Sequence, residues 1–397
     1  MHHKYTNVRL RYKREFRKRP ILKGIQERTP ARPINSSNHL RKKTPGNKMT
    51  SSRAFGTLPD GRIVRSWLLQ NSAGSALEVI EYGGIVTHLH MPDREGKLAD
   101  VVLGFDTLEP YLAGHPYFGV IAGRVAGRIS GARFVLEGRT YELAGNDPPN
   151  HLHGGGAGFD KKLWSAVPMT RPDGADSVRL TLESADGEEG YPGNLTAHVS
   201  FTLTEGNEFI FETEVSSDRT TPASLTHHSY FNLAGESAGT ATDHELRIFA
   251  DTFAPTDAAM TLLGRRVSVE EGGDFLQTKR IGDVLPDLLG AHGDLYFVNR
   301  PPGDRTSLLP AARVREPRSG RIMEVLTTED CVQFYSGVGL DGSLVGKSGA
   351  NYGKHQGFCL ECEGYPDGVN TPELGDILVQ PGEPRRHTTI YAFTTSP

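Results

Sequence analysis

The chain is poor in cysteine and has no long apolar run. Its 397 residues include only three cysteines, too few for the disulfide framework of a small secreted protein. No apolar stretch approaches the roughly 18 residues that a membrane-spanning helix needs. The N-terminal region also lacks the apolar segment of a secretory signal. These absences favour a globular protein of the cytoplasm that has no membrane partner.

Long helices are also disfavoured, because 46 glycines and 25 prolines interrupt the chain. Apolar and polar residues alternate at 178–183, 199–203 and 209–215, the pattern of half-buried strands. The pair Gly206-Asn207 lies between the last two and predicts a hairpin turn. Residues 281–289 suit one or two short helical turns. We therefore expect an all-β protein, a large and mostly antiparallel β-sandwich.

Charge divides the chain at about residue 48. Residues 1–48 hold 15 Lys or Arg and 2 Glu, whereas the remainder has an excess of acidic residues. The first segment has no apolar periodicity, so we expect a disordered basic tail. It is either a translated upstream extension with Met49 as the true start, a basic arm for nucleic acid, or a transit peptide. No repeat or linker-like break divides residues 49–397, which are expected to form one domain.

A glutamate stands in a strand-like segment near the C-terminus. In the run Phe-Cys-Leu-Glu-Cys at 358–362, Leu360 and Cys362 share one face of a strand, and Cys359 and Glu361 share the other. The two cysteines therefore point apart, which argues against a redox pair or a zinc site. Acidic residues are depleted in strands, so Glu361 marks either a solvent-exposed face or a functional site.

Two histidine-containing loops have the composition of functional loops. His153 precedes two glycines, and His228 follows His227 and precedes Ser-Tyr-Phe-Asn. Imidazoles and carboxylates move protons near neutral pH, and they also bind metals. The spacing of these residues does not decide between an acid/base site and a metal site.

Seven collinear stretches resemble the galactose mutarotase (aldose 1-epimerase) family, and the resemblance covers essentially residues 55–395. They are Gly-Phe-Asp-Thr-Leu-Glu-Pro-Tyr-Leu at 104–112, Gly-Arg-Val-Ala-Gly-Arg-Ile at 123–129, Asn-His-Leu-His-Gly-Gly at 150–155, Asp-Gly-Glu-Glu-Gly-Tyr-Pro-Gly at 186–193, His-Ser-Tyr-Phe-Asn-Leu at 228–233, Gln-Phe-Tyr-Ser-Gly at 333–337 and Pro-Asp-Gly-Val-Asn at 366–370.

The resemblance implies a galactose mutarotase-like sandwich that interconverts the α and β anomers of a free aldose, such as galactose or glucose. It implies that Glu361 is the general base and His228 the general acid, and that His153 lies beside the ring oxygen or a neighbouring hydroxyl. No cofactor or metal is implied, and the only partner is a monosaccharide, bound by a monomer or homodimer without nucleic acid. Five further side chains are implied to bind the sugar or line its pocket: Arg128, Ser229, Tyr230, Asp294 and Gln333.

The chain departs from the family pattern near the site. Gly127 stands where the family usually has Asn, His227 where it commonly has Asn, and Leu295 where it usually has His. The glycine removes one amide that would contact the sugar. Three alternatives remain: a non-catalytic carbohydrate-binding protein, an epimerase-like enzyme for a phosphorylated sugar, and a metal-dependent hydrolase or dioxygenase. The second needs cationic groups at the pocket rim, and the sequence does not place Arg124 or Arg265 there.

Overall fold

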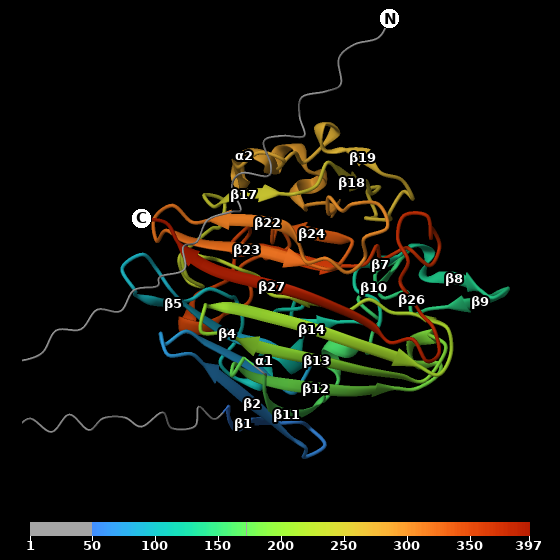
Figure 1. Cartoon of the computed structure of the whole chain (residues 1–397), viewed down its shortest axis with the longest axis horizontal. Coiled ribbons are helices and arrows are strands. Elements are labelled where there is room, and N and C mark those ends of the chain that lie inside the picture. Colours follow the sequence, from blue (N-terminus) through green and yellow to red (C-terminus); the bar gives the residue numbers. More distant parts are fainter. Residues whose placement is uncertain (1–49, 172) are drawn as a thin grey trace, which may run out of the picture. The chain divides into compact units, whose positions relative to one another are not determined.

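The computed structural model describes residues 50–171 and 173–397, and strands dominate this part of the chain (Figure 1). All of its strand ladders are antiparallel. The expectation of an all-β, mostly antiparallel sandwich is confirmed. The expected basic tail at 1–48 lies outside the described residues.

A nine-stranded sheet crosses the molecule and supplies one layer of the sandwich (Figure 1). Its first strands form by local pairing, since Asn207 has the positive φ of 61° that a tight turn requires, and Phe209 pairs with Leu203. The expected strands and hairpin at 178–215 are thus confirmed. In spatial order the strands are β11 (Ser165–Thr170), β12 (Asp176–Ser184), β13 (Leu195–Leu203), β14 (Glu208–Ser217), β27 (Arg385–Thr395), β23 (Arg321–Thr327), β22 (Leu309–Arg315), β17 (Glu245–Ile248) and β20 (Lys279–Arg280).

Two five-stranded sheets complete the main architecture. The first consists of β1 (Ser51–Thr57), β2 (Ile63–Gln70), β3 (Ala76–Ile80), β4 (Val86–Pro92) and β5 (Leu98–Asp100). The second has the order β19 (Val267–Ser268), β18 (Thr252–Ala254), β21 (Leu295–Phe297), β24 (Cys331–Tyr335) and β25 (Cys359–Glu363).

Short ladders and helices connect these sheets. The expected helical turns at 281–289 are present as a short helix followed by a 3₁₀ turn at Leu285–Asp287. No helix in the described residues is long and apolar enough to cross a membrane. The two-stranded ladders pair β6 (Val120–Ala122) with β16 (Thr226–His228), β7 (Arg128–Ile129) with β10 (His151–Leu152), β8 (Arg133–Leu136) with β9 (Arg139–Glu142), and β15 (Thr221–Pro222) with β26 (Leu378–Val379); the α-helices are α1 (Leu108–Ala113) and α2 (Ile281–Val284).

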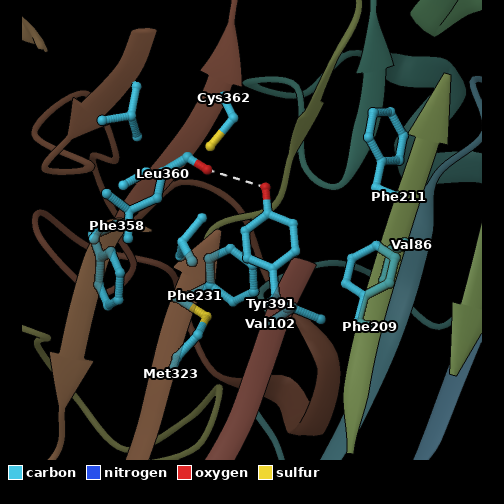
Figure 2. Packing of buried hydrophobic residues seen from close by; sticks show 14 of the residues in the cluster. Val86, Val102, Phe209, Phe211, Phe231, Met323, Phe358, Leu360, Cys362 and Tyr391 are labelled. Atoms are coloured by element: carbon cyan, nitrogen blue, oxygen red, sulfur yellow. Dashed lines mark hydrogen bonds between the residues drawn. The ribbon is translucent and has the colours of Figure 1, made fainter. Parts of the chain in front are cut away.

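One apolar core joins all three sheets. Leu69 of the first sheet, Phe211 of the nine-stranded sheet and Leu360 of the third belong to the same buried cluster. Figure 2 shows its centre, where the Tyr391 hydroxyl donates a hydrogen bond of 3.1 Å to the Leu360 carbonyl. Because Leu360 and Cys362 are packed on this side, β25 is held firmly and its opposite face points away from this cluster.

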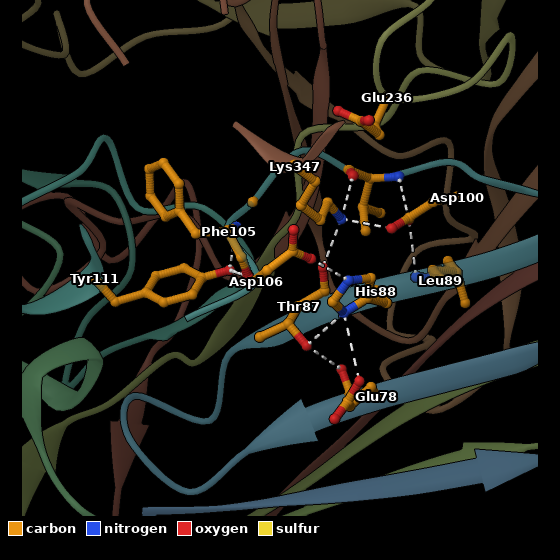
Figure 3. Close-up of polar contacts among 12 residues, drawn as sticks. Glu78, Thr87, His88, Leu89, Asp100, Phe105, Asp106, Tyr111, Glu236 and Lys347 are labelled. Carbon is orange, nitrogen blue, oxygen red and sulfur yellow. Dashed lines mark hydrogen bonds and ion pairs between the residues drawn. The ribbon is translucent and has the colours of Figure 1, made fainter. Parts of the chain in front are cut away.

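A buried lysine ties the first sheet to the loop before β25 (Figure 3). The Lys347 ammonium group donates to the Thr87 carbonyl and the Asp100 carboxylate, both at 2.6 Å, and to the Val102 carbonyl at 2.9 Å. Three acceptors satisfy its three N–H donors. The lysine therefore stabilises the packing of this loop and is not free to bind a ligand.

Candidate functional site

The outward face of β25 forms the wall of a cavity of about 210 Å³. Strand register places Leu295, Gln333 and Glu361 side by side, since Gln333 pairs with Leu295 on one side and Glu361 on the other. All three side chains line the cavity. Glu361 is only 3% exposed, so the interpretation of its face as solvent-exposed is wrong.

His228 reaches Glu361 from a different sheet. It is the last residue of β16, and its Nε2 lies 3.4 Å from Oε2 of Glu361. The rings of Tyr117 and Tyr230 stack on the imidazole at centroid distances of 5.7 and 5.3 Å. The pair is therefore fixed between aromatic rings and shielded from bulk water.

This burial changes the acidity of both groups. It raises the pKa of Glu361 to about 8, against an opposing effect of the Arg128 charge. It lowers the pKa of His228 to about 4. Between these values the pair holds one proton, and in the free site that proton rests on the carboxyl group because burial disfavours charge. Such a pair can give and take protons near neutral pH.

His153 lies next to this pair and has a defined tautomer. It exchanges hydrogen bonds with Gly127, whose backbone N–H donates to the ring Nδ1 at 3.1 Å and whose carbonyl accepts from the backbone N–H of His153 at 3.0 Å. A ring nitrogen that accepts a hydrogen bond carries no proton, so Nε2 carries it. Burial lowers the pKa of His153 well below its ordinary value, so the ring is a neutral donor.

The same three side chains are of the types that bind metal ions. Ligand atoms of His153, His228 and Glu361 lie within 4.8 Å of one another, so they form a candidate metal-binding triad. A ligating histidine normally donates its other ring N–H to an acceptor. Nδ1 of His153 instead accepts from Gly127. His153 therefore does not suit a metal as it is oriented, and the arrangement favours proton transfer over metal binding.

Arg128, Asp294 and Gln333 approach the cavity from three further elements. Arg128 of β7 donates from Nε to Asp147 at 2.7 Å, which orients its guanidinium group. Gln333 donates from Nε2 to the Phe334 carbonyl at 2.7 Å. Burial raises the pKa of Asp294, just before β21, to about 6. These side chains can hydrogen-bond several hydroxyl groups of one small ligand.

Ser229 is the one residue of the expected set that is not among those lining the cavity. It is buried, and its hydroxyl has no partner among the described residues. Its neighbour His227 also points away, into the core between Phe209, Phe211 and Tyr391. Burial lowers the pKa of His227 to about 3, so it is a neutral packing residue.

Sequence reasoning missed five polar side chains of the cavity, namely Tyr117, Thr256, His292, Tyr335 and Glu363. Glu363 has a signal in the sequence, because alternation along β25 puts it on the same face as Glu361. Tyr117 and His292 have none, since both lie in loops whose paths depend on the tertiary structure.

The two arginines considered for a phosphate site do not line the cavity. Arg124 is 2% exposed and donates to the carbonyls of Pro192 and Gly193, so its role is structural. Among the lining residues Arg128 is the only Lys or Arg, and its Nε already donates to Asp147. A cavity with this single, paired cation does not suit a phosphorylated ligand.

Comparisons with known proteins agree with this geometry. The family model described as aldose 1-epimerase matches residues 65–392. A galactose mutarotase from Bos taurus is 43% identical over 350 residues, which cover 86% of this chain and 98% of that protein. An aldose 1-epimerase from Escherichia coli (strain K12) is 32% identical and covers 84% and 96%, respectively. The solved structure of a galactose 1-epimerase from Lactobacillus acidophilus NCFM superposes with a TM-score of 0.76 at 25% identity, over 88% of this chain and 99% of that one.

Proposed function

Since this chain belongs to the aldose 1-epimerase family and is an isomerase of the α and β anomers of an aldose, we propose that Glu361 and His228 carry out its proton transfers. The observation that supports this assignment is the buried contact of 3.4 Å between His228 Nε2 and Glu361 Oε2. Free galactose and glucose are the proposed substrates, because relatives that are 42–43% identical are named galactose mutarotase and the cavity is lined by hydrogen-bonding groups.

Anomers interconvert when a cyclic hemiacetal opens. A base takes the proton of the C1 hydroxyl while an acid protonates the ring oxygen, and the C1–O5 bond breaks to give the aldehyde. Rotation about C1–C2 presents the other carbonyl face, and the reverse proton transfers close the ring. Both oxygens are bonded to C1, so a single hemiacetal can contact Glu361 and His228 together.

The pair has the one proton that this cycle requires. In the free site the proton rests on Glu361, and the bound hemiacetal favours the form with a carboxylate and an imidazolium. The C1 hydroxyl then donates to the carboxylate and the ring oxygen accepts from His228, while the charge of Arg128 stabilises the carboxylate. Glu361 is thus the general base and His228 the general acid of ring opening, and they exchange roles in closure.

The surrounding groups hold the sugar during this cycle. The Nε2–H of His153 is a neutral donor for the ring oxygen or a neighbouring hydroxyl. Arg128, Asp294 and Gln333 bind further hydroxyls, and the ring of Tyr230 supports His228. Positioning of this kind lowers the barrier because the reacting groups are already in contact.

Polarimetry on freshly dissolved α-D-galactose and α-D-glucose, in the presence of EDTA, tests the proposal. We expect the wild type to accelerate relaxation, and Glu361→Gln and His228→Asn each to lose about 100-fold or more of the catalysed rate. Glu324→Gln, at an exposed position of β23, is the matched control and should retain full activity. Activity that is lost in EDTA and restored by a metal ion would contradict the mechanism.

We also propose that residues 49–397 form the single catalytic domain of a cytoplasmic monomer or homodimer. The family match at 65–392 lies inside these bounds. The excess of acidic residues in this part of the chain disfavours nucleic acid, a polyanion, as a partner.

A further inference from the structure

Glu363 is a buried carboxyl group that the proposed proton transfers do not use. It is the last residue of β25, two positions after Glu361 on the same face of the strand, and it lines the cavity. Its side chain is almost fully buried, yet Oε2 has no hydrogen-bond partner among the described residues. Buried polar groups are rarely left unpaired unless a ligand or water completes them.

This carboxyl group lies against the glycine at 127. A Cβ atom at Gly127 would lie 3.0 Å from Oε1 of Glu363 and 2.4 Å from Cγ of Pro366. Gly127 also has a φ of 73°, in the left-handed region that favours glycine. The carboxyl group of Glu363 thus lies beside the Cα atom of Gly127, where other residues would have a side chain.

The environment favours the protonated form of this group. Burial raises the pKa of Glu363 well above its ordinary range, and the neighbouring carboxyl of Glu361 adds to the effect, while the charge of Arg128 opposes it. A neutral carboxyl group has one O–H donor and a carbonyl acceptor. It is thus equipped to bind a hydroxyl group, which is itself a donor and an acceptor.

We propose that Glu363 determines substrate specificity by hydrogen-bonding a hydroxyl group of the bound aldose on a carbon other than C1. The inference rests on the proposed function, which places the C1 hydroxyl at Glu361. Residues two apart in a strand are separated by about 6.5 Å, roughly the width of a sugar ring. Glu363 therefore contacts a different hydroxyl group, and it favours the aldoses that present that hydroxyl in the correct configuration.

The test compares Glu363→Gln, which keeps a donor and an acceptor, with Glu363→Met, which has a similar length and neither. Exchange NMR measures the anomer interconversion of D-galactose, D-glucose and their 2-, 3-, 4- and 6-deoxy forms, and titration calorimetry measures their binding. We expect Glu363→Met to raise KM for the preferred aldose by about 10-fold, with kcat changed less than 3-fold. Glu363→Gln should stay within about 3-fold of the wild type.

One deoxy sugar should reveal the contact. For the sugar that lacks the bound hydroxyl, wild type and Glu363→Met should have equal KM values, because neither protein can form the hydrogen bond in question. An unchanged KM for the parent aldoses, or an equal rise for every deoxy sugar, overturns the inference. Both variants should keep the wild-type melting temperature, since Oε2 has no protein partner. A lowered melting temperature together with uniform losses would assign Glu363 a structural role.

The two readouts separate this inference from the proposed function. If the wild type turns over aldoses and Glu363→Met behaves like it, only the inference fails. If the wild type binds aldoses without turnover and Glu363→Met weakens that binding selectively, the proposed function fails and the inference stands. A wild type that binds no aldose overturns both.

Discussion

Glu361 and His228 have pKa values displaced in opposite directions by the same cause. Burial favours the neutral form of each group. It raises the pKa of the carboxyl group to about 8 and lowers the pKa of the imidazole to about 4. A single proton is therefore shared over the intervening pH range. Two neutral, interconvertible partners suit a reaction in which the acid and the base exchange roles in every turnover.

These pKa values predict a bell-shaped pH profile of kcat/KM. Activity should fall as pH drops through about 4, where His228 takes up a second proton for the pair, and as pH rises through about 8, where the pair loses its only proton. Stopped-flow polarimetry after brief exposure to each pH, corrected for the spontaneous reaction, measures this profile. A flat profile from pH 3 to 9 would contradict the one-proton pair.

At the scale of elements, β25 separates two environments. Leu360 and Cys362 face the core, and Cys359, Glu361 and Glu363 face the other side. The strand can present a precisely placed carboxyl group because its opposite face is packed and its Leu360 carbonyl is bonded to Tyr391 (Figure 2). The loop that precedes it is anchored through Lys347 (Figure 3).

Removing the lysine anchor should destabilise the protein strongly. Lys347→Met leaves the Asp100 carboxylate buried without its cation, which we expect to lower the free energy of unfolding by about 3–5 kcal/mol. Urea denaturation measures the loss. Lys347→Met combined with Asp100→Asn should recover part of it, because the uncompensated charge is gone. Equal stabilities of wild type and Lys347→Met would show that the ion pair contributes nothing.

At the scale of the whole molecule, buried titratable groups predict a stability maximum between about pH 5 and 7. Burial lowers the pKa values of His227 and His387 to about 3 and that of His244 to about 4. In the unfolded chain a histidine has a pKa of about 6.5, so below this pH the unfolded chain binds protons that the folded protein does not. Stability is therefore lost as pH falls from 6.5 towards 3.

The carboxyl groups act in the opposite direction. Burial raises the pKa values of Glu329 and Glu361 to about 8, so the folded protein holds protons that the unfolded chain releases, and stability is lost as pH rises from about 4.5 to 8. Thermal denaturation from pH 4 to 9 measures the loss of stability on both sides of the maximum. His227→Leu should reduce only the loss at acid pH, and a stability maximum above pH 8 would contradict this account.

Local pattern accounts for much of what could be predicted. Alternation identified the strands at 178–215 and put Glu361 opposite Leu360 and Cys362, because strand geometry depends only on neighbouring residues. The resemblance to a known family pointed to Glu361 and His228 as the proposed base and acid, and to five other residues that line the cavity. It also implied that Ser229 lines the pocket, whereas alternation past the end of β16 puts Ser229 on the face opposite His228 and Tyr230, which do line the cavity.

The sequence by itself therefore determined the strand class, the polar face of β25 and the types of group available for proton transfer. Only the tertiary structure brought His228 of β16 within 3.4 Å of Glu361 of β25, buried both, and placed Glu363 against Gly127. The physical reason is that the pKa values depend on burial and the distances depend on packing between sheets. Burial and packing involve residues that are far apart in the chain, so no local sequence pattern encodes them.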